Sequence, residues 1–341
     1  MNQQTTRRTK STERTIYYIY DGECPLCQQA ALALRIQQDY GELKLINARE
    51  NKEHVIVKQI NELGLDMDEG MVIYDEEQFY HGHSALNFMA KYSETKGIFN
   101  LLGKSLYWSE TLAKVTYPWL RGIRNWLVRR KNVSRIDNLN LQSEPIFKFV
   151  FGDDWDKLPT VMHKHYANRP YTSDSYSTVG KLNVMCAGPL KMFAPIFWLL
   201  GGIPPHNEKN VPITVNFKSD KNTKAMHFDR VFRFNSRKHY RFHSKMVPVK
   251  GNEMIEVMKF GIGWKMQIIW QDQKVKLIHK GYVFNLFGHF IPLPLNAILG
   301  SGYAEETAVD ENTFDMFVKI THPLWGKIYQ YDGRFTMRED G

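Results

Sequence analysis

Cysteine is scarce in this chain, since its 341 residues include only three. So few thiols exclude a small secreted domain held by disulfides and are typical of a reducing compartment. An apolar leader is also missing: residues 1–14 are polar and basic, so we expect a disordered tail rather than a signal peptide. The most apolar stretch, 182–204, is interrupted by prolines, a lysine and a Gly-Gly pair. It falls short of the roughly 20 residues that a membrane-spanning helix needs, and we expect a cytoplasmic protein.

Motifs for nucleic-acid binding are absent as well. The formal net charge is +9, and most of the excess falls after Gln142. The basic residues are interleaved along strand-like segments instead of forming a cluster, which is typical of solvated surface. We therefore expect no nucleic-acid partner.

Two of the three cysteines stand close together, in the motif Asp21-Gly22-Glu23-Cys24-Pro25-Leu26-Cys27. A strand-like run precedes the motif and a run of strong helix formers, Gln28 to Gln38, follows it. Cys24 is thus predicted near the N-cap of a helix, with Pro25 at its first position, where proline is tolerated. Free backbone N–H groups and the helix dipole would lower the pKa of Cys24, and Cys27 lies one turn on, placed to resolve a mixed disulfide. The motif predicts thiol-disulfide chemistry.

Three other interpretations of the cysteine pair stay open. A tetrahedral zinc site would need about two more ligands, for which His81 and His83 are the candidates. A structural disulfide would close only a tight loop, and two inert buried thiols are the third interpretation. The chain has no second Cys-x-x-Cys pair, and we expect neither a metal nor a cofactor. The third cysteine, Cys186, has apolar neighbours that favour a buried, unreactive thiol.

The order of predicted elements around the motif is strand, helix, strand, helix, two short strands and a helix, over residues 15–92. A βαβ start followed by a hairpin and a helix is the thioredoxin-like order. Residues 99–131 continue with helical composition, and Pro118 interrupts them. We expect two helices or one kinked helix there.

The segment 99–131 also combines Trp108, Trp119 and Trp126 with an excess of basic residues. A basic amphipathic segment with tryptophans can lie on an anionic membrane surface, which would place the protein peripherally at the inner membrane face. The alternative is a helical lid that packs its aromatic face on the redox domain, and aromatic stripes at helical spacing favour it. Residues 132–143 are polar and aperiodic, which predicts a linker.

From residue 144 onward the pattern is that of an antiparallel β domain. Short helices are expected over 146–166. Nine alternating segments follow, at 176–186, 213–218, 226–234, 240–247, 254–260, 264–271, 275–283, 313–321 and 327–337. They predict a barrel or a strongly curved, lipocalin-like sheet, because closure removes exposed edges. The fold class is therefore α+β, with a tail (1–14), a thioredoxin-like domain and its helical extension (15–131), a linker (132–143) and a β-rich domain (144–341).

Period-two alternation indicates which side chains face the interior of the β-rich domain. Trp264 and Trp270 share one apolar face, and Arg230 lies on the apolar face of another strand. A buried guanidinium needs an anionic or carbonyl partner, either in the protein or on a ligand. The candidate carboxylates of the chain are Asp174, Glu256 and Glu305.

The Asp-x-x-Cys-x-x-Cys pattern directly after a strand resembles the DCC family of thiol-disulfide oxidoreductases, and residues 71–86 are similar to its second half. The resemblance covers about 15–130. It implies that Cys24 is the nucleophile, Cys27 the resolving thiol and Asp21 the motif carboxylate. One departure from ordinary thioredoxins is that no proline precedes the strand at Met71, where a cis-proline would help to hold a substrate chain.

The β-rich part resembles an uncharacterised bacterial family, domain-of-unknown-function family 4166, and this resemblance implies no activity. It rests on Leu158-Pro159 with His163, Gly202-Ile203-Pro204-Pro205, Phe228-x-Arg230-x-Phe232 and Pro292-Leu293-Pro294.

These observations predict a thiol-disulfide oxidoreductase. Cys24 would attack a disulfide of a protein or small molecule, Cys27 would resolve the mixed disulfide, and a thiol donor would supply electrons. Asp21 either accepts a proton from Cys27 or shapes the turn. The alternative function is binding of a lipid or another apolar ligand in the β-barrel, with Arg230 at its polar head. The thioredoxin-like domain would then be a docking or redox-sensing module.

Overall fold

The computed structural model describes residues 14–33, 41–92, 107–131, 133–192, 195, 202–236, 238–286 and 288–338. The chain divides into two compact units, Met1–Asn140 and Leu141–Gly341. The boundary falls inside the stretch predicted as a linker. We describe each unit by itself.

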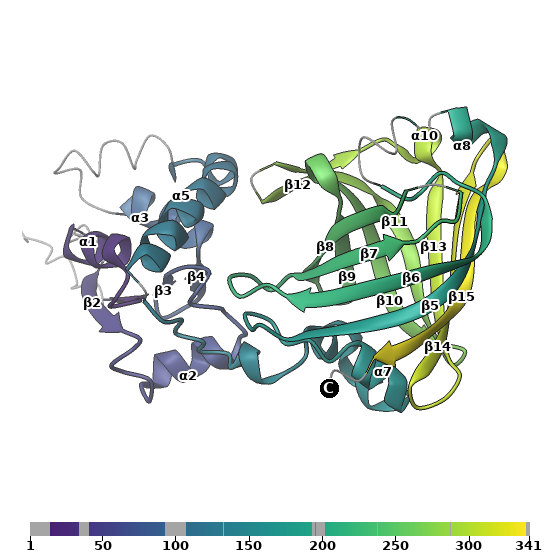
Figure 1. The fold of residues 1–341 in the computed structure, drawn as a ribbon. Coiled ribbons are helices and arrows are strands. Elements are labelled where there is room, and N and C mark those ends of the chain that lie inside the picture. Colours follow the sequence, from purple (N-terminus) through teal and green to yellow (C-terminus); the bar gives the residue numbers. More distant parts are fainter. Residues whose placement is uncertain are drawn as a thin grey trace, which may run out of the picture. The chain divides into compact units, whose positions relative to one another are not determined.

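The first unit is a four-stranded mixed sheet with helices, as the thioredoxin-like order predicts (Figure 1). Its elements are β1 (Thr15–Tyr20), α1 (Pro25–Ala33), β2 (Glu42–Asn47), α2 (Val55–Glu62), β3 (Val72–Tyr74), β4 (Phe79–His81), α3 (His83–Tyr92) and α5 (Glu110–Arg130). The sheet order is β2-β1-β3-β4; β1 and β2 are parallel and the other pairs antiparallel. The predicted helix end at 34–38 lies outside the described residues, as do the expected tail up to residue 13 and residues 99–106.

Alternation along β1 divides the core of this unit into two layers. Tyr18 packs in a cluster with Ala31 of α1 and Phe88 of α3. The next residue, Ile19, packs in a second cluster that includes Ile60 of α2. The central strand is therefore covered on both faces, which fixes the start of α1 at one end of a rigid sheet.

Helix α5 runs through Pro118 as a single element. It turns a face with Ala113 and Arg124 inward, where they are 0% and 7% exposed. The tryptophans do not lie on this inner face, since Trp108, Trp119 and Trp126 are 59%, 51% and 56% exposed. The expectation that the tryptophans form an aromatic face packed on the redox domain is therefore wrong, because the inner face holds Ala113, Tyr117, Leu120 and Arg124 instead.

The second unit is a closed antiparallel barrel. Its strands are β5 (Ser175–Cys186), β6 (Glu208–Ser219), β7 (Met226–Phe232), β8 (Tyr240–Lys250), β9 (Glu253–Val257), β10 (Ile262–Gln271), β11 (Lys274–Leu286), β12 (His289–Leu293), β13 (Ser301–Ala308), β14 (Thr313–His322) and β15 (Gly326–Arg338). The sheet order is β10-β9-β8-β7-β6-β5-β15-β14-β13-β11-β12, and β10 also pairs with β11. Ten strands thus close the barrel, while β12 pairs with the last part of β11.

All nine predicted strands are present, and two more were missed. The sequence of β13 carries Ser301, Gly302 and two adjacent glutamates, residues of low strand propensity. The sequence of β12 contains Pro292, which is tolerated because this strand has a neighbour on one side only.

Short helices lie at both ends of the barrel (Figure 1). The predicted helical segment forms η1 (Leu141–Ser143), α6 (Ile146–Phe151), η2 (Gly152–Lys157) and α7 (Thr160–His165). Helices α8 (Gly188–Met192) and α10 (Asn296–Leu299) lie at the opposite end from α7. Phe147 and Trp155 join the core of the barrel, so the first segment closes its end.

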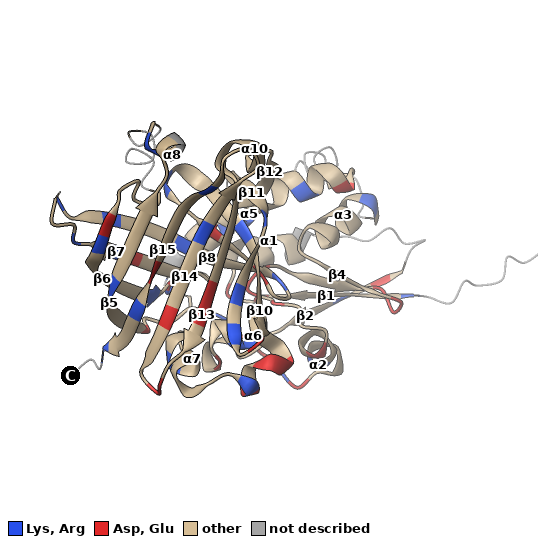
Figure 2. Cartoon of the chain, turned by 90° about the vertical axis from the view of Figure 1, so that its right-hand side faces the viewer, with Lys and Arg blue, Asp and Glu red and all other residues tan. Residues whose placement is uncertain are grey.

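Charges of both signs are interspersed along the barrel strands (Figure 2), as expected for a solvated surface. Across the described ranges, no helix combines the length and apolar character needed to cross a bilayer. The apolar stretch 182–204 contributes the end of β5 and helix α8.

Candidate functional site

The cysteine motif is folded by hydrogen bonds of its own backbone. The Cys24 N–H donates to the Asp21 carbonyl at 3.1 Å, which closes the turn after β1. The Cys24 carbonyl accepts the N–H of Gln28 at 2.9 Å, the first hydrogen bond of α1. Since α1 begins at Pro25, Cys24 occupies the N-cap position that the sequence predicts.

Both thiols of the motif are free and buried: Cys24 has no exposed surface and Cys27 is 8% exposed. The backbone N–H of Cys27 donates to Cys24 Sγ at 3.4 Å. Cys27 is the third residue of α1, so the sulfur takes the place of the side-chain oxygen that caps many helices. The same donor would stabilise a thiolate more than a thiol.

The two thiols have opposite pKa shifts. The hydrogen bond from the Cys27 side chain lowers the pKa of Cys24 to about 6, although burial acts against this, and Arg124 lowers it further. The same hydrogen bond raises the pKa of Cys27 well above its ordinary value, with burial acting in the same direction. At neutral pH the pair therefore holds one thiolate, on Cys24, and one thiol, on Cys27.

Arg124 brings a positive charge to this pair from helix α5. Its Nη2 lies 3.4 Å from Asp21 Oδ2, and its Nη1 donates to the Asp68 carbonyl. Burial acts to lower the pKa of Arg124, but the charges of the two cysteines and Asp21 raise it further above its already high value. Sequence reasoning missed this residue. The sequence feature that could have located Arg124 is its helical spacing from Ala113, Tyr117 and Leu120, which places it on the same face of α5.

Asp21 is the carboxylate on which the arginines converge. Its Oδ1 accepts the N–H of Glu23 at 3.0 Å, the pattern of an Asx-turn, and Nε of Arg49 at 2.6 Å. Its Oδ2 is 3.2 Å from Nη2 of Arg49 and 3.4 Å from Nη2 of Arg124. Because these donors occupy both oxygens, the geometry favours shaping of the turn and clamping of Arg124 over proton transfer from Cys27.

The histidines considered as zinc ligands have other contacts. His81 Nε2 lies 3.0 Å from the Asp66 carbonyl, and the His83 ring meets the Tyr117 ring edge-on at 6.3 Å. Within the described ranges, no three His, Cys, Asp or Glu side chains are grouped as a metal site requires.

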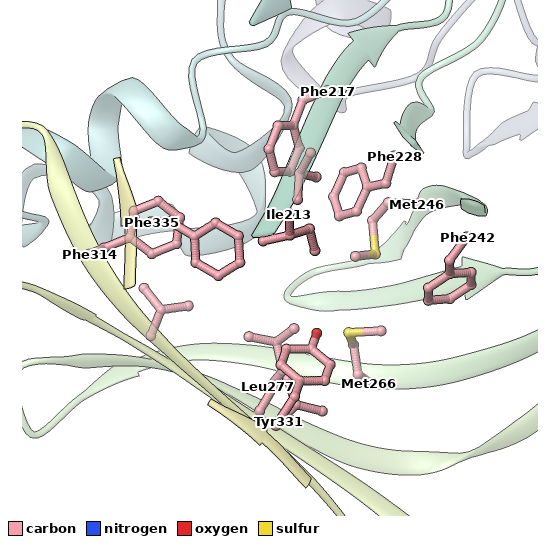
Figure 3. Close-up of a cluster of buried hydrophobic side chains, with 14 of the residues drawn as sticks. Ile213, Phe217, Phe228, Phe242, Met246, Met266, Leu277, Phe314, Tyr331 and Phe335 are labelled. Carbon is pink, nitrogen blue, oxygen red and sulfur yellow. The ribbon is translucent and has the colours of Figure 1, made fainter. Parts of the chain in front are cut away.

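The barrel of the second unit encloses a cavity of about 370 Å³. Apolar side chains from opposite walls point toward one another around it, among them Phe217, Phe228, Leu277 and Phe314 (Figure 3). Arg230 and Trp264 belong to its lining, as predicted from alternation, whereas Trp270 does not. Both tryptophans pack against the hydrophobic core, but only Trp264 also reaches the cavity.

Arg230 finds its partner within the protein. Its Nη1 lies 2.9 Å from Glu256 Oε1 and donates to Ser244 Oγ at 2.9 Å, and Ser244 in turn donates to Glu256 Oε1 at 2.6 Å. The guanidinium carbon is 4.9 Å from the ring centre of Phe228 and 4.8 Å from that of Phe242. Of the three candidate carboxylates, the structure selects Glu256.

A second buried carboxylate, Glu306, also lines the cavity and was missed with its strand. Its Oε1 lies 3.5 Å from His165 Nε2, and its Oε2 accepts the Tyr166 hydroxyl hydrogen bond. Burial would raise the pKa of Glu306, but His165 and Tyr166 lower it below its ordinary value. No motif signals this residue, because Glu306 follows Glu305 in a stretch without apolar alternation.

Two family models match the chain. The model of a DCC1-like thiol-disulfide oxidoreductase matches residues 18–130, and the model of a domain of unknown function (DUF4166) matches residues 158–335. The two matches correspond to the two resemblances inferred from the motifs. None of the curated proteins compared with the chain matches it.

Solved structures give only distant similarities. The crystal structure of Rv2717c from M. tuberculosis is 8% identical, covers 53% of this chain and 98% of its own, and has a TM-score of 0.29. The dehydratase domain of the polyketide PpsC from Mycobacterium tuberculosis is 5% identical, covers 53% and 81%, and has a TM-score of 0.13. Scores this low assign neither a fold nor an activity.

Proposed function

We propose that this chain, which belongs to the DUF4166 family and carries a DCC1-like thiol-disulfide oxidoreductase domain in its first unit, exchanges disulfides through Cys24 and Cys27. The observation that carries the proposal is the hydrogen bond from the Cys27 N–H to Cys24 Sγ at a helix start, beside the guanidinium of Arg124. Thiolates so stabilised are the nucleophiles of disulfide exchange.

The reaction proceeds in two displacements. The Cys24 thiolate attacks one sulfur of a substrate disulfide, forms a mixed disulfide and releases the other sulfur as a thiolate. The negative charge that had raised the pKa of Cys27 is then gone, so Cys27 loses its proton more readily and attacks Cys24 Sγ. The products are the Cys24–Cys27 disulfide and a second substrate thiol. A thiol donor restores the dithiol by the reverse steps.

Stabilisation of the thiolate also bears on the direction of electron flow. A low thiol pKa stabilises the reduced form and raises the reduction potential. We expect a value between about −270 mV, found for thioredoxin with a thiol pKa near 7, and about −120 mV, found for strong dithiol oxidants with a pKa near 3.5.

The test is to trap the mixed disulfide. The Cys27→Ser variant is incubated with glutathione disulfide at pH 7, and the adduct is located by peptide mass spectrometry. We expect one glutathione on Cys24, whereas the Cys24→Ser variant accumulates none on Cys27. An adduct on Cys27 of the Cys24→Ser variant with no adduct on Cys24 would reverse the roles, and no adduct on either would end the proposal.

We also propose, for the second unit, the binding of an apolar molecule inside the barrel. The supporting observation is the cavity of about 370 Å³, which lies in the range of about 300–1,000 Å³ typical of ligand sites and is lined mainly by apolar side chains. Native mass spectrometry of the purified full chain tests it, because a bound apolar molecule adds a discrete mass. Absence of any added mass, together with failure to take up a neutral apolar dye, would contradict it.

A further inference from the structure

The cavity of the barrel has an apolar mouth. Ile298 of α10 and Trp325, in the turn between β14 and β15, line the cavity and yet are 64% and 49% exposed. Because these two side chains face both the cavity and solvent, they mark the opening of the cavity. At the other end Phe147 and Tyr166 line the cavity and are buried, so that end is closed. A ligand therefore enters past apolar side chains.

Deep in the cavity each buried carboxylate already has partners within the protein. The guanidinium of Arg230 is matched by Glu256 at 2.9 Å and lies between two aromatic rings. Glu306 is held by His165 and Tyr166 and is close enough to Arg230 for that charge to lower its pKa. Two carboxylates thus face one guanidinium in the buried part of the lining. Lys259 also lines the cavity, but it is exposed and solvated.

A bound carboxylate would be a third anion in this enclosed space. Burial of a charge without its own partner is strongly unfavourable, and the existing pair would have to be broken to supply one. The remaining donors of Arg230, Nε and Nη2, have no hydrogen-bond acceptor among the side chains that the structure describes. They suit one uncharged acceptor, a hydroxyl or carbonyl oxygen.

Resting on the proposed binding of an apolar molecule, we propose that the barrel selects an uncharged amphiphile, such as a long-chain alcohol or ester, against the corresponding carboxylate. The oxygen of the ligand accepts from Arg230 and its chain extends toward the mouth at Ile298 and Trp325. The ion pair with Glu256 is the specificity determinant, because it satisfies the guanidinium before any anion arrives.

The test compares 1-dodecanol with dodecanoate at pH 8, as competitors of the neutral dye N-phenyl-1-naphthylamine bound to the full chain. We expect dodecanol to displace the dye at a concentration at least tenfold lower. In the Glu256→Gln variant, dodecanoate should gain at least tenfold while dodecanol changes less than threefold. Glu253→Gln, on the same strand but paired with the outer Lys265, is the matched control and should leave both competitors unchanged.

The outcomes separate the two proposals. If neither dye nor dodecanol binds the native chain, ligand binding itself fails. If dodecanoate competes as well as dodecanol at pH 8, binding stands and the selection against charge is wrong. Should Glu256→Gln fail to fold, native protein at pH 5 replaces it: protonation of the fatty acid is expected to strengthen its binding at least tenfold relative to pH 8, and an unchanged value would overturn the inference.

A separate observation concerns the outer face of α5. Leu112, Val115, Trp119, Ile123 and Trp126 are 46–56% exposed and recur at intervals of three and four residues. At 100° per residue they fall within about 80° of one another, so they form one stripe along the helix. We call these five residues the α5 stripe. Trp108, just before the helix, is 59% exposed as well.

Basic side chains stand at the C-terminal end of the α5 stripe. Arg130 lies over the ring of Trp126 with 5.3 Å between the guanidinium carbon and the ring centre, and Lys131, just after the helix, is exposed. Lys114 and Arg121 project from another side of the helix, where they pair with Glu110 at 2.7 Å and with Glu69 at 3.8 Å. The single acidic residue of the helix is Glu110. Tryptophans with neighbouring cations on an exposed apolar stripe are the composition of segments that lie in the interface of an anionic bilayer.

We infer that the α5 stripe docks on an anionic lipid surface. The inner face of the same helix holds Arg124 at the thiol pair, so docking places the redox site next to the bilayer. The charges of Arg130 and Lys131 favour an anionic lipid surface over an apolar protein surface, which would leave these two side chains unmatched.

Co-sedimentation with vesicles tests this. At 50 mM salt the full chain should bind vesicles of phosphatidylglycerol and phosphatidylcholine, but at least tenfold less to phosphatidylcholine alone. The Trp119→Ser/Trp126→Ser variant should lose at least tenfold, whereas Val55→Ser/Leu63→Ser, which removes exposed apolar side chains of the same unit, should bind normally. Light scattering of the native chain tests whether a second copy of the chain covers the α5 stripe instead of lipid. Self-association that the Trp119→Ser/Trp126→Ser variant abolishes, without any lipid binding, would overturn the inference.

Discussion

The two units each bury cysteine, yet they treat it in opposite ways. Cys24 has a pKa lowered to about 6, whereas burial raises the pKa of Cys186 to about 11. Both thiols are at most 2% exposed. The difference lies in what faces the sulfur: the Cys27 thiol, the Cys27 backbone N–H and a guanidinium for Cys24, and the Ala187 carbonyl at 3.8 Å for Cys186. Burial alone makes a thiol inert, and the hydrogen-bond donors of Cys27 together with Arg124 reverse its effect.

The two buried arginines extend the comparison. Arg124 stands 3.4 Å from a carboxylate that is already bound by Arg49 at 2.6 Å, so much of its charge acts on the thiols. Arg230 stands 2.9 Å from Glu256 and shares Ser244 with it. One guanidinium is thus left to influence a reactive group, and the other is neutralised by its partner. Burial of an arginine does not reveal its role; the distance and prior occupancy of its carboxylate do.

The largest expected effect is in alkylation of the two thiols. At pH 7 a thiol of pKa 6 is about 90% ionised and one of pKa 11 about 0.01%, so the ionised fractions of Cys24 and Cys186 should differ by about 10⁴-fold. Because a thiolate of lower pKa is the weaker nucleophile, Cys24 should react with iodoacetamide about 100-fold faster than Cys186. Peptide mass spectrometry of a labelling time course gives both rates, and the urea-unfolded chain, in which they should converge, is the control. A ratio of the two alkylation rates below ten in the native chain would contradict the contrast between the units.

The second largest expected effect is the loss of local stability when one buried arginine is replaced. Arg230→Met leaves Glu256 buried and uncompensated, so we expect a loss of about 3–5 kcal/mol of local stability, much of it recovered by adding Glu256→Gln. Arg124→Met should cost less, since Arg49 still pairs with Asp21. Hydrogen exchange of peptides from β7 and from α1 measures the two units separately. Equal losses at both arginines would contradict the distinction drawn above.

The pH dependence of stability should differ between redox forms. The folded pKa of Cys24 is depressed below its unfolded value of about 8.5, so its contribution is fully present above the unfolded pKa and disappears as pH falls through 6. The reduced first unit should therefore gain up to about 1.4 kcal/mol per pH unit between pH 6 and 8.5. The form with a Cys24–Cys27 disulfide should lack this gain. Urea midpoints of both forms across this range provide the measurement.

More of the thiol site in the first unit than of the cavity in the second could be predicted from the sequence. Cys24, Cys27 and Asp21 are contiguous, and turn and helix signals place them without any tertiary contact. Arg124 comes from a helix about one hundred residues away, and only its spacing from Ala113 and Tyr117 hints at its direction. Periodicity locates a face of a helix but cannot say what that face meets.

In the barrel, alternation located Arg230 and Trp264 but not the whole lining. Trp270 shares the predicted face of Trp264 and still lies outside the cavity lining, because a single face extends from the cavity into the packed core. Glu306 was missed since its strand has low propensity, and its partners His165 and Tyr166 come from a helix that closes the barrel end. These three polar side chains come together only when the barrel is closed.

The smallest predicted effect tests how Cys24 gets its low pKa. Replacing Arg124 with Met removes the nearby positive charge but keeps the Cys27 N–H, so the pKa of Cys24 should rise by about one unit, equivalent to about 1.4 kcal/mol. The reduction potential should become about 30 mV more negative, because the reduced form loses that stabilisation. Thiolate absorbance at 240 nm against pH gives the pKa, and equilibration with glutathione gives the potential. Arg121→Met, on the same helix but 3.8 Å from Glu69, should change neither. If Arg124→Met also changes neither, the thiol and the N–H of Cys27 sustain the thiolate without Arg124, and the two buried arginines are more alike than their partners suggest.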